Sequence, residues 1–391
     1  MNYSQICELK LQILSNNEPI ELKDKILKVV DSLPQMSTNE KLRCIDILYN
    51  EIKGYGAIQK FLDDKSISEI MINGIEHIFV EKNGEIFPEK PVFESTEHLM
   101  QLIYKIASEI GREVNQSRPI LDARLKDGSR VNVVLSPVAI SGPIVTIRKF
   151  NNSATTMATL AESGTFTNEL RKFLEILIKS KYNIFISGGT GTGKTTLLNY
   201  LCQSIPNDER IITIEDAAEI DIKNHEHVIS METRNSNVSD TAVTMSKLIK
   251  NALRMRPDRI IVGEVRGEEV IDMLQAMNTG HEGSISTGHS NSPLDMLIRL
   301  EVISASYSEI DHNLIRKQII SAIDIVIQLE RNRGRRQIEY VVEIKKDSEE
   351  YEIHTIYDRR IDQNTTQAGF EERICSRYKL DKYFEGQAKS S

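Results

Sequence analysis

The residues most able to do chemistry lie at positions 188–196, in the sequence Gly-Gly-Thr-Gly-Thr-Gly-Lys-Thr-Thr. Gly188, Gly193, Lys194 and Thr195 fill each fixed position of the phosphate-binding (Walker A) pattern G-x-x-x-x-G-K-[ST]. In such a loop, backbone N–H groups turn inward around a phosphate, and the following helix adds the positive end of its dipole. Lys194 is expected to reach the β- and γ-phosphates, and the Thr195 hydroxyl to bind Mg²⁺. The segment therefore predicts a nucleoside triphosphate site.

The residues around this loop decide whether the match is more than a glycine-rich turn that fits the pattern by chance. Before it, residues 184–186 are Ile-Phe-Ile, an apolar run typical of a buried parallel strand. After it, residues 197–201 carry leucines at helical spacing. Strand, loop and helix follow in the order that a phosphate-binding loop requires. The candidate nucleotide-binding residues are Gly188, Gly189, Thr190, Gly191, Thr192, Gly193, Lys194, Thr195 and Thr196.

Two acidic residues follow apolar strand candidates. Glu215 comes after residues 211–214, and Glu264 comes after the apolar segment that starts at residue 259. Ligands of open α/β sheets bind at the carboxyl ends of parallel strands, where a carboxylate can hold Mg²⁺ or orient the attacking water. Glu264 is the leading candidate to orient or deprotonate that water, and Glu215 to hold the metal through its water shell, although these two roles can be exchanged. For the Glu215-Asp216 pair, a helix N-cap at Asp216 is the alternative interpretation.

Two histidines bracket a further strand candidate at residues 284–288. His281 precedes this strand and His289 follows it. A lone histidine is more often structural, and no cysteine lies nearby to complete a zinc site. At strand ends, both are candidates to sense the γ-phosphate or to relay charge between sites.

Three arginines upstream of the loop lie in or beside strand segments where other charges are sparse. They are Arg124, Arg130 and Arg148. Phosphoryl transfer depends mainly on positioning and charge stabilisation, so arginines that close over the γ-phosphate from another domain or subunit are expected. A solvated surface position is the alternative for any one of them.

The alternation of helix and strand in residues 169–330 predicts a parallel sheet covered by helices on both faces. Its strand candidates are residues 183–187, 210–214, 227–231, 259–263 and 284–288. Beyond them, residues 323–330 and 337–344 alternate like hairpin strands around a turn at Arg333-Gly334-Arg335. The predicted parts are an N-terminal helical segment at 1–62, an α+β N-domain at 63–150, a linker at 151–168, the α/β domain at 169–345, and a C-terminal strand with a poorly ordered tail at 346–391.

Within the N-domain, the sequence predicts four strands and one helix. The strands are residues 70–72, 78–80, 130–134 and 144–147, and the helix runs from about residue 97 to 110.

Composition narrows the class of protein. At 391 residues, with 40% hydrophobic and 27% charged side chains, the chain suits two or three globular domains. No apolar run approaches the roughly 18–20 residues of a membrane span, and no secretory signal is visible. The four cysteines form no C-x-x-C pair, as expected of free thiols in a reducing compartment. A net charge of −8 argues against a dedicated nucleic-acid surface. These features predict a cytoplasmic protein.

Taken together, these motifs resemble those of a known family: the secretion-type ATPases of type II and type IV secretion, and within them the Tad (Flp) pilus assembly ATPase. The resemblance covers roughly residues 50–345, with the motifs in the family's order. They are residues 118–132 and 146–150 of the N-domain, the phosphate loop at 188–196, the Asp box at 214–216, residues 251–258 leading into the modified Walker B segment at 263–267, and the His box at 277–283 and 286–292.

The resemblance implies a hexameric ring of two-domain subunits at the cytoplasmic face of the inner membrane. Each subunit would hold ATP and Mg²⁺ between its N-domain and a RecA-like C-domain, and hydrolysis would drive rigid-body domain movements. Such rings act on a platform protein in the inner membrane, which extends or retracts a pilus or moves a substrate.

Residue roles carry over from the resemblance position by position. One departure lies at residues 288–290, Gly-His-Ser, where the family usually has a larger apolar residue before the histidine and alanine after it. Arg124 and Arg234 are additional candidates, and the first 50 residues, which match no motif, are candidates for partner choice. The roles implied are Lys194 and Thr195 as phosphate and Mg²⁺ ligands, Glu215 as the Asp-box acid, Glu264 as the Walker B acid, His281 and His289 as the His-box histidines, and Arg130 and Arg148 as arginines that reach the γ-phosphate.

Three alternatives to a pilus motor remain open. A conjugation or effector-secretion ATPase is the runner-up within the same family. A ring helicase or DNA-translocating ATPase would share the RecA-like core, but 6% aromatic residues and no tryptophan argue against a base-stacking groove. A scaffold that binds ATP without hydrolysing it is the third, and the intact Lys194, Thr195, Glu215 and Glu264 argue against it.

Overall fold

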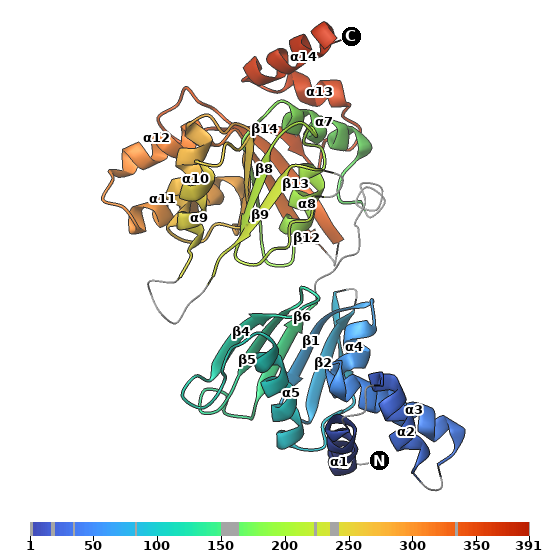
Figure 1. Ribbon diagram of the computed structural model, residues 1–391. Helices are drawn as coiled ribbons and strands as arrows, with labels where there is room; N and C mark the ends of the chain where they lie inside the picture. The colour runs from blue at the N-terminus through green and yellow to red at the C-terminus, as the bar shows by residue number, and fades with distance from the viewer. Residues whose placement is uncertain are drawn as a thin grey trace. The chain divides into compact units, whose positions relative to one another are not determined.

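The computed structural model divides the chain into two compact units, Met1–Ser153 and Ala154–Ser391. They run from blue to teal and from green to red in Figure 1. The residues described are 3–16, 20–33, 36–82, 84–149, 164–222, 225–234, 242–332 and 335–390. The linker predicted at 151–168 therefore lies, up to residue 163, outside the described residues. No helix in the described ranges is both long and apolar enough to span a bilayer.

Three helices open the first unit and pack around a small core of their own. Their apolar residues recur every three or four positions, so each helix has one face to bury. The third helix starts at Ser37, whose side chain accepts from the Glu40 backbone N–H while the Glu40 carboxylate accepts from the Ser37 backbone N–H. The helices are α1 (Tyr3–Ser15), α2 (Leu22–Asp31) and α3 (Thr38–Ile52), followed by the short η1 (Gly56–Ile58) and α4 (Gln59–Asp63).

An antiparallel sheet forms the rest of the first unit, in the order β3-β2-β1-β6-β5-β4. Helix α5 (Thr96–Glu109) buries its apolar residues in the same core as the sheet. The two edge strands were missing from the sequence prediction, because an edge strand exposes much of its length and loses a clear apolar pattern. The strands are β1 (Ile67–Asn73), β2 (His77–Lys82), β3 (Glu85–Glu89), β4 (Ile120–Arg124), β5 (Arg130–Val134) and β6 (Ile144–Arg148).

The second unit contains an eight-stranded sheet in the order β14-β13-β12-β7-β11-β10-β8-β9. The six strands from β12 to β9 are parallel, and β13 and β14 are antiparallel additions. The parallel strands are β7 (Ile184–Gly188), β8 (Ile211–Glu215), β9 (Val228–Glu232), β10 (Arg259–Val262), β11 (Ile285–Gly288) and β12 (Ile325–Asn332). The antiparallel strands are β13 (Arg335–Ile344) and β14 (Ile353–Asp358). The predicted parallel sheet is confirmed, and the predicted strands agree with β7–β11 to within one residue.

Helices cover both faces of this sheet (Figure 1). Along β7, Ile184 and Ile186 enter one core and Phe185 enters the other, as the alternation of a strand requires. The first core lies under α7 (Asn168–Lys179) and α8 (Lys194–Cys202). The second lies under α9 (Met245–Ala252), α10 (Glu269–Asn278), α11 (Pro293–Ser306) and α12 (His312–Ala322).

The C-terminal tail differs from the sequence prediction. Helices α13 (Gln367–Glu372) and α14 (Tyr378–Ser390) replace the expected poorly ordered segment. Phe370, Ile374 and Leu380 are buried in the first core, where the Phe370 ring contacts those of Phe173 and Tyr357. These few large apolar side chains stabilise a segment whose average composition is polar.

Candidate active site

The phosphate loop joins β7 to α8. Gly188 ends the strand, residues 189–193 form the loop, and Lys194 begins the helix with Thr195 and Thr196 in its first turn. Gly193 has a φ of 94°, in the left-handed region that favours glycine. At Gly188 a Cβ atom would lie 2.6 Å from the carbonyl oxygen of Leu329 on β12. The conformation of the loop therefore depends on these glycines.

The loop is also held together by its own side chains. The Thr192 hydroxyl donates to the Gly189 carbonyl oxygen at 2.9 Å. Lys194 is only 7% exposed, and its Nζ donates to the carbonyl oxygens of Gly188 and Gly189, both at 3.0 Å. Burial lowers the pKa of Lys194. The buried ammonium is thus held by neutral acceptors that a phosphate oxygen can replace.

A chain of four polar side chains runs from Lys194 across the carboxyl edge of the sheet. Lys194 Nζ lies 3.1 Å from His289 Nδ1, and His289 Nε2 lies 2.8 Å from Glu264 Oε1, close but not aligned for a hydrogen bond. Arg266 Nη2 donates to Glu264 Oε2 at 2.5 Å. These residues follow β7, β11 and β10, which are adjacent strands, so their side chains meet.

The charge states of this chain follow from its contacts. Burial acts to raise the pKa of Glu264, but the hydrogen bond and charge of Arg266, together with the neighbouring His289 and Lys194, outweigh it, so the pKa is lowered and Glu264 is ionised at neutral pH. Burial and the charge of Lys194 lower the pKa of His289, which is therefore neutral. An ammonium only donates, so His289 Nδ1 accepts from Lys194, and the ring carries its proton on Nε2, facing Glu264.

Glu215 ends β8 and lies beside the strand that leads to Glu264. Its Oε1 accepts from the backbone N–H groups of Glu219 and Ile220 at 2.9 and 3.0 Å, and its Oε2 accepts from that of Ile220 at 3.2 Å. A Cβ atom at Gly263 would lie 2.9 Å from Glu215 Cγ. The carboxylate therefore holds the loop after β8 in place, and no helix begins at Asp216 in the described stretch 211–222. A metal role for Glu215 stays a prediction.

The two predicted histidines lie at opposite edges of the sheet. His289 follows the carboxyl end of β11, whereas His281 precedes its amino end. The His281 carbonyl oxygen accepts from the Ser284 hydroxyl at 2.8 Å. The structure therefore brings His289 to the phosphate loop and does not bring His281 there. The linear spacing could not show this, because a strand separates the two residues.

The predicted arginines of the first unit form a row across three strands. Arg124 on β4 is the cross-strand partner of Arg130 on β5, which is in turn the partner of Arg148 on β6. Glu69 on β1 is the next partner of Arg148. Direct cross-strand partners share one face of a sheet, so the three arginines lie on the same face. Arg234, the other candidate, lies in the second unit just after β9 and is bridged to Val243.

Arg266 is a residue of the candidate site that sequence reasoning missed. It lies two residues after Glu264 within the Walker B segment, and only the fold shows that its side chain returns to the carboxylate. Thr287 on β11 also contributes, since its hydroxyl donates to the Gly263 carbonyl oxygen at 2.7 Å and ties the segment to the sheet.

The side chains fit Mg²⁺ bound together with a nucleotide. Among the described residues, no group of three or more His, Cys, Asp or Glu side chains is arranged to hold a metal alone. Mg²⁺ in phosphate-transfer sites usually takes one or two protein ligands and completes its shell with phosphates and water. The Thr195 hydroxyl, in the first turn of α8, and the ionised Glu264 are suitable groups.

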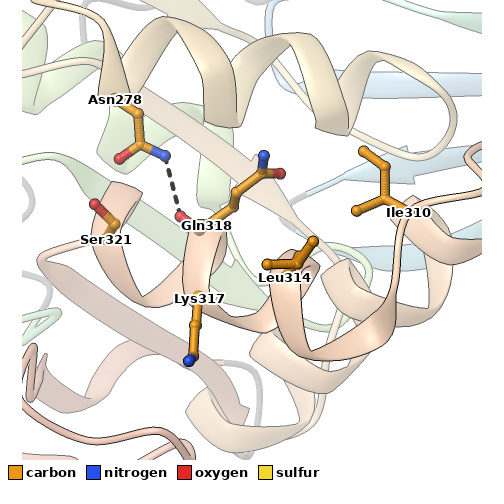
Figure 2. A pocket seen from close by; sticks show the side chains of 6 residues that line it. All are labelled: Asn278, Ile310, Leu314, Lys317, Gln318 and Ser321. Atoms are coloured by element: carbon orange, nitrogen blue, oxygen red, sulfur yellow. Dashed lines mark hydrogen bonds between the residues drawn. The ribbon is translucent and has the colours of Figure 1, made fainter.

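A separate groove of about 510 Å³ lies along α10 and α12 (Figure 2). The side chain of Asn278, at the end of α10, donates to the Gln318 carbonyl oxygen at 3.1 Å. Among the six described residues that line the groove, Lys317 alone is titratable, and none carries a carboxylate. Its lining consists of Asn278, Ile310, Leu314, Lys317, Gln318 and Ser321.

Comparison with known proteins agrees with this geometry. Residues 51–378 match the family model described as "Type II/IV secretion system protein". The chain is 30% identical over 319 residues to a putative conjugal transfer protein of Mycobacterium tuberculosis, covering 80% of this chain and 90% of that protein. It is 35% identical over 288 residues to the conjugal transfer protein TrbB of Rhizobium radiobacter, covering 73% and 85%. The solved ATPase DotB of Legionella pneumophila aligns with a TM-score of 0.53 at 19% identity over 84% of this chain and 90% of that one, which shows a shared fold.

Proposed function

Because the chain belongs to the type II/IV secretion system protein family, we propose that it binds ATP and Mg²⁺ at the phosphate loop and hydrolyses the ATP to drive a transport machine. The observation that carries this proposal is the chain Lys194–His289–Glu264–Arg266 at the carboxyl edge of the sheet. In this chain, His289 lies between the ionised carboxylate of Glu264 and the ammonium of Lys194. An ATP hydrolase needs a cation for the phosphates and an acceptor for the attacking water in that proximity.

The residues of the second unit take distinct roles in this proposal. Lys194 and the loop N–H groups bind the phosphates, and Thr195 binds the metal, which when present neutralises charge on the β- and γ-phosphates. Glu264 accepts a hydrogen bond from the attacking water and orients it towards the γ-phosphorus. Neutral His289 links the lysine to that carboxylate, and Glu215 supports the metal's water shell. His281 has no part in this step, because it lies at the opposite edge.

The arginine row of the first unit is proposed to stabilise the transition state in an assembled ring. Arg124, Arg130 and Arg148 lie on one face of the sheet as cross-strand neighbours. Guanidinium groups gathered on one face suit a triphosphate whose γ-group gains charge during transfer. A hexamer in which one subunit completes the site of the next would make hydrolysis depend on assembly.

The machine that such a ring would drive is proposed to be a Tad/Flp-type pilus or a related secretion system, through a platform protein at the cytoplasmic face of the inner membrane. The N-domain motifs at residues 118–132 and 146–150 support the pilus assignment. A conjugation apparatus is the second candidate, because two relatives bear the names of conjugal transfer proteins.

The proposal is tested by Mg²⁺-dependent phosphate release from ATP over a dilution series of the full chain. We expect the rate to rise more steeply than protein concentration and to disappear in Glu264→Gln. The matched control is Glu268→Gln, an exposed acid four residues further along the chain. Absence of turnover at every concentration, or full turnover in Glu264→Gln, would contradict the proposal.

A further inference from the structure

A second pair of arginines lies beside the phosphate loop, on the hairpin of β12 and β13. Arg331 near the end of β12 and Arg336 near the start of β13 are direct cross-strand partners. Their side chains therefore project from the same face of the hairpin. Arg335, next in sequence to Arg336, points to the other face, because successive side chains of a strand alternate.

The hairpin face that carries these two arginines meets the phosphate loop. A Cβ atom at Gly191 would lie 3.8 Å from Arg331 Nη1. A Cβ atom at Gly193 would lie 3.1 Å from Arg336 Cδ and 3.9 Å from its Nε. Strand pairing also brings β12 next to the start of the loop, since Leu329 of β12 is in register with Gly188 of β7. Both side chains thus lie against the loop whose backbone is expected to hold phosphate.

The chemistry of the two side chains indicates what they bind. A guanidinium group stays charged at every physiological pH and forms paired hydrogen bonds with phosphate. Both groups lie against a loop whose N–H groups and lysine are expected to hold phosphate. Their placement therefore indicates a phosphate as their ligand.

The order of strands indicates which phosphates are involved. Strand β7 has β12 on one side and β11, followed by β10, on the other. Lys194 turns towards His289 and Glu264, which follow β11 and β10, so the γ-phosphate end is expected on that side. The hairpin approaches from the opposite side of β7, where the α- and β-phosphates of a bound nucleotide would lie.

We propose that Arg331 and Arg336 are nucleotide-binding residues that hold the α- and β-phosphates from the β12–β13 hairpin. This inference rests on the proposed function of the loop. These arginines contact groups that ADP and ATP share and that hydrolysis leaves unchanged. They therefore contribute to affinity for both nucleotides and not to the rate of the chemical step.

The experiment measures binding of the fluorescent nucleotide mant-ADP to the full chain, together with kcat and KM for ATP. The variants Arg331→Met and Arg336→Met keep the apolar stem and remove the charge. Each is expected to raise the Kd for mant-ADP and the KM for ATP by about tenfold, the effect of losing a charge-assisted hydrogen bond, with kcat changed less than twofold. Arg336→Lys, which keeps the charge, is expected to restore part of the affinity.

Two controls keep the outcome interpretable. Arg335→Met, on the same hairpin but the other face, is expected to leave Kd and KM within twofold of wild type. Without nucleotide, Arg331→Met is expected to unfold at about the same temperature as wild type, because the variant keeps the apolar stem of an exposed side chain. A purely structural role for this arginine would lower that temperature and leave the Kd of the folded protein unchanged, and would overturn the inference.

Failure of the inference is distinguishable from failure of the proposed function. If wild type binds mant-ADP, Lys194→Ala does not, and both methionine variants bind as wild type does, the loop binds nucleotide but the arginines have no role. If kcat falls while Kd is unchanged, they act at the γ-phosphate and the inference is wrong. If wild type itself binds no nucleotide, the proposed function fails first.

Discussion

Replacing Arg266 by glutamine should move the acid limb of the ATPase pH profile to higher pH. Arg266 donates to Glu264 at 2.5 Å, and its hydrogen bond and charge are what keep the pKa of this half-buried carboxyl below its ordinary value. Without it, burial is opposed only by His289 and Lys194, and the pKa rises. Glu264 must be ionised to accept from water, so activity is lost as pH falls through this pKa.

The size of the effect follows from the exposure of the pair. A hydrogen bond to a charged group contributes about 1.5–3 kcal/mol. The Arg266 side chain is 60% exposed, so solvent screening favours the lower figure. At 1.36 kcal/mol per pKa unit, about 1.5 kcal/mol moves the limb by about one pH unit. We expect kcat of Arg266→Gln to match that of wild type at pH 7 and above and to fall below it only towards pH 5, the acid end of the measured range.

The assay is kcat for ATP between pH 5 and pH 9, measured for wild type, Arg266→Gln and the exposed control Arg254→Gln. Loss of Arg266 also raises the pKa of His289, so the double variant Arg266→Gln/His289→Gln shows which group titrates. A limb that persists in the double variant belongs to Glu264. The reasoning is refuted if kcat of Arg266→Gln falls by the same factor at every pH, because the arginine would then act on the substrate directly.

Three further predictions concern the framework of the site. Gly188→Ala places a methyl group against the Leu329 carbonyl oxygen, and calorimetric titration with ADP should show binding weakened at least tenfold, with a lower Tm. Arg259→Leu leaves the buried Glu209 without its main partner and should lower the free energy of unfolding by about 3–5 kcal/mol, measured in urea. Phe370→Ala empties a fully buried position under α13 and should cost about 3–5 kcal/mol, with faster proteolysis after residue 360 as the local readout.

Local patterns predicted the loop and the parallel strands, because a phosphate-binding loop is contiguous and a buried strand is uniformly apolar. Residues 184–186 and 260–262 show this, because each of these runs is apolar and buried along its whole length. The tail lacked such a signal, since Phe370, Ile374 and Leu380 are scattered among polar residues and gain their stability from a distant core. The average composition of a segment therefore does not show that a few of its side chains are buried against another part of the chain.

The contacts of the site depend on strand order and register, which local spacing does not contain. Arg266 and Glu264 are two residues apart in an irregular strand-to-helix segment, where spacing alone does not fix side-chain direction, and they share a hydrogen bond. His281 and His289 are close in sequence but lie at opposite edges of the sheet, because β11 separates them. Register likewise makes partners of Arg130 and Arg148, which lie on strands joined by a longer connection.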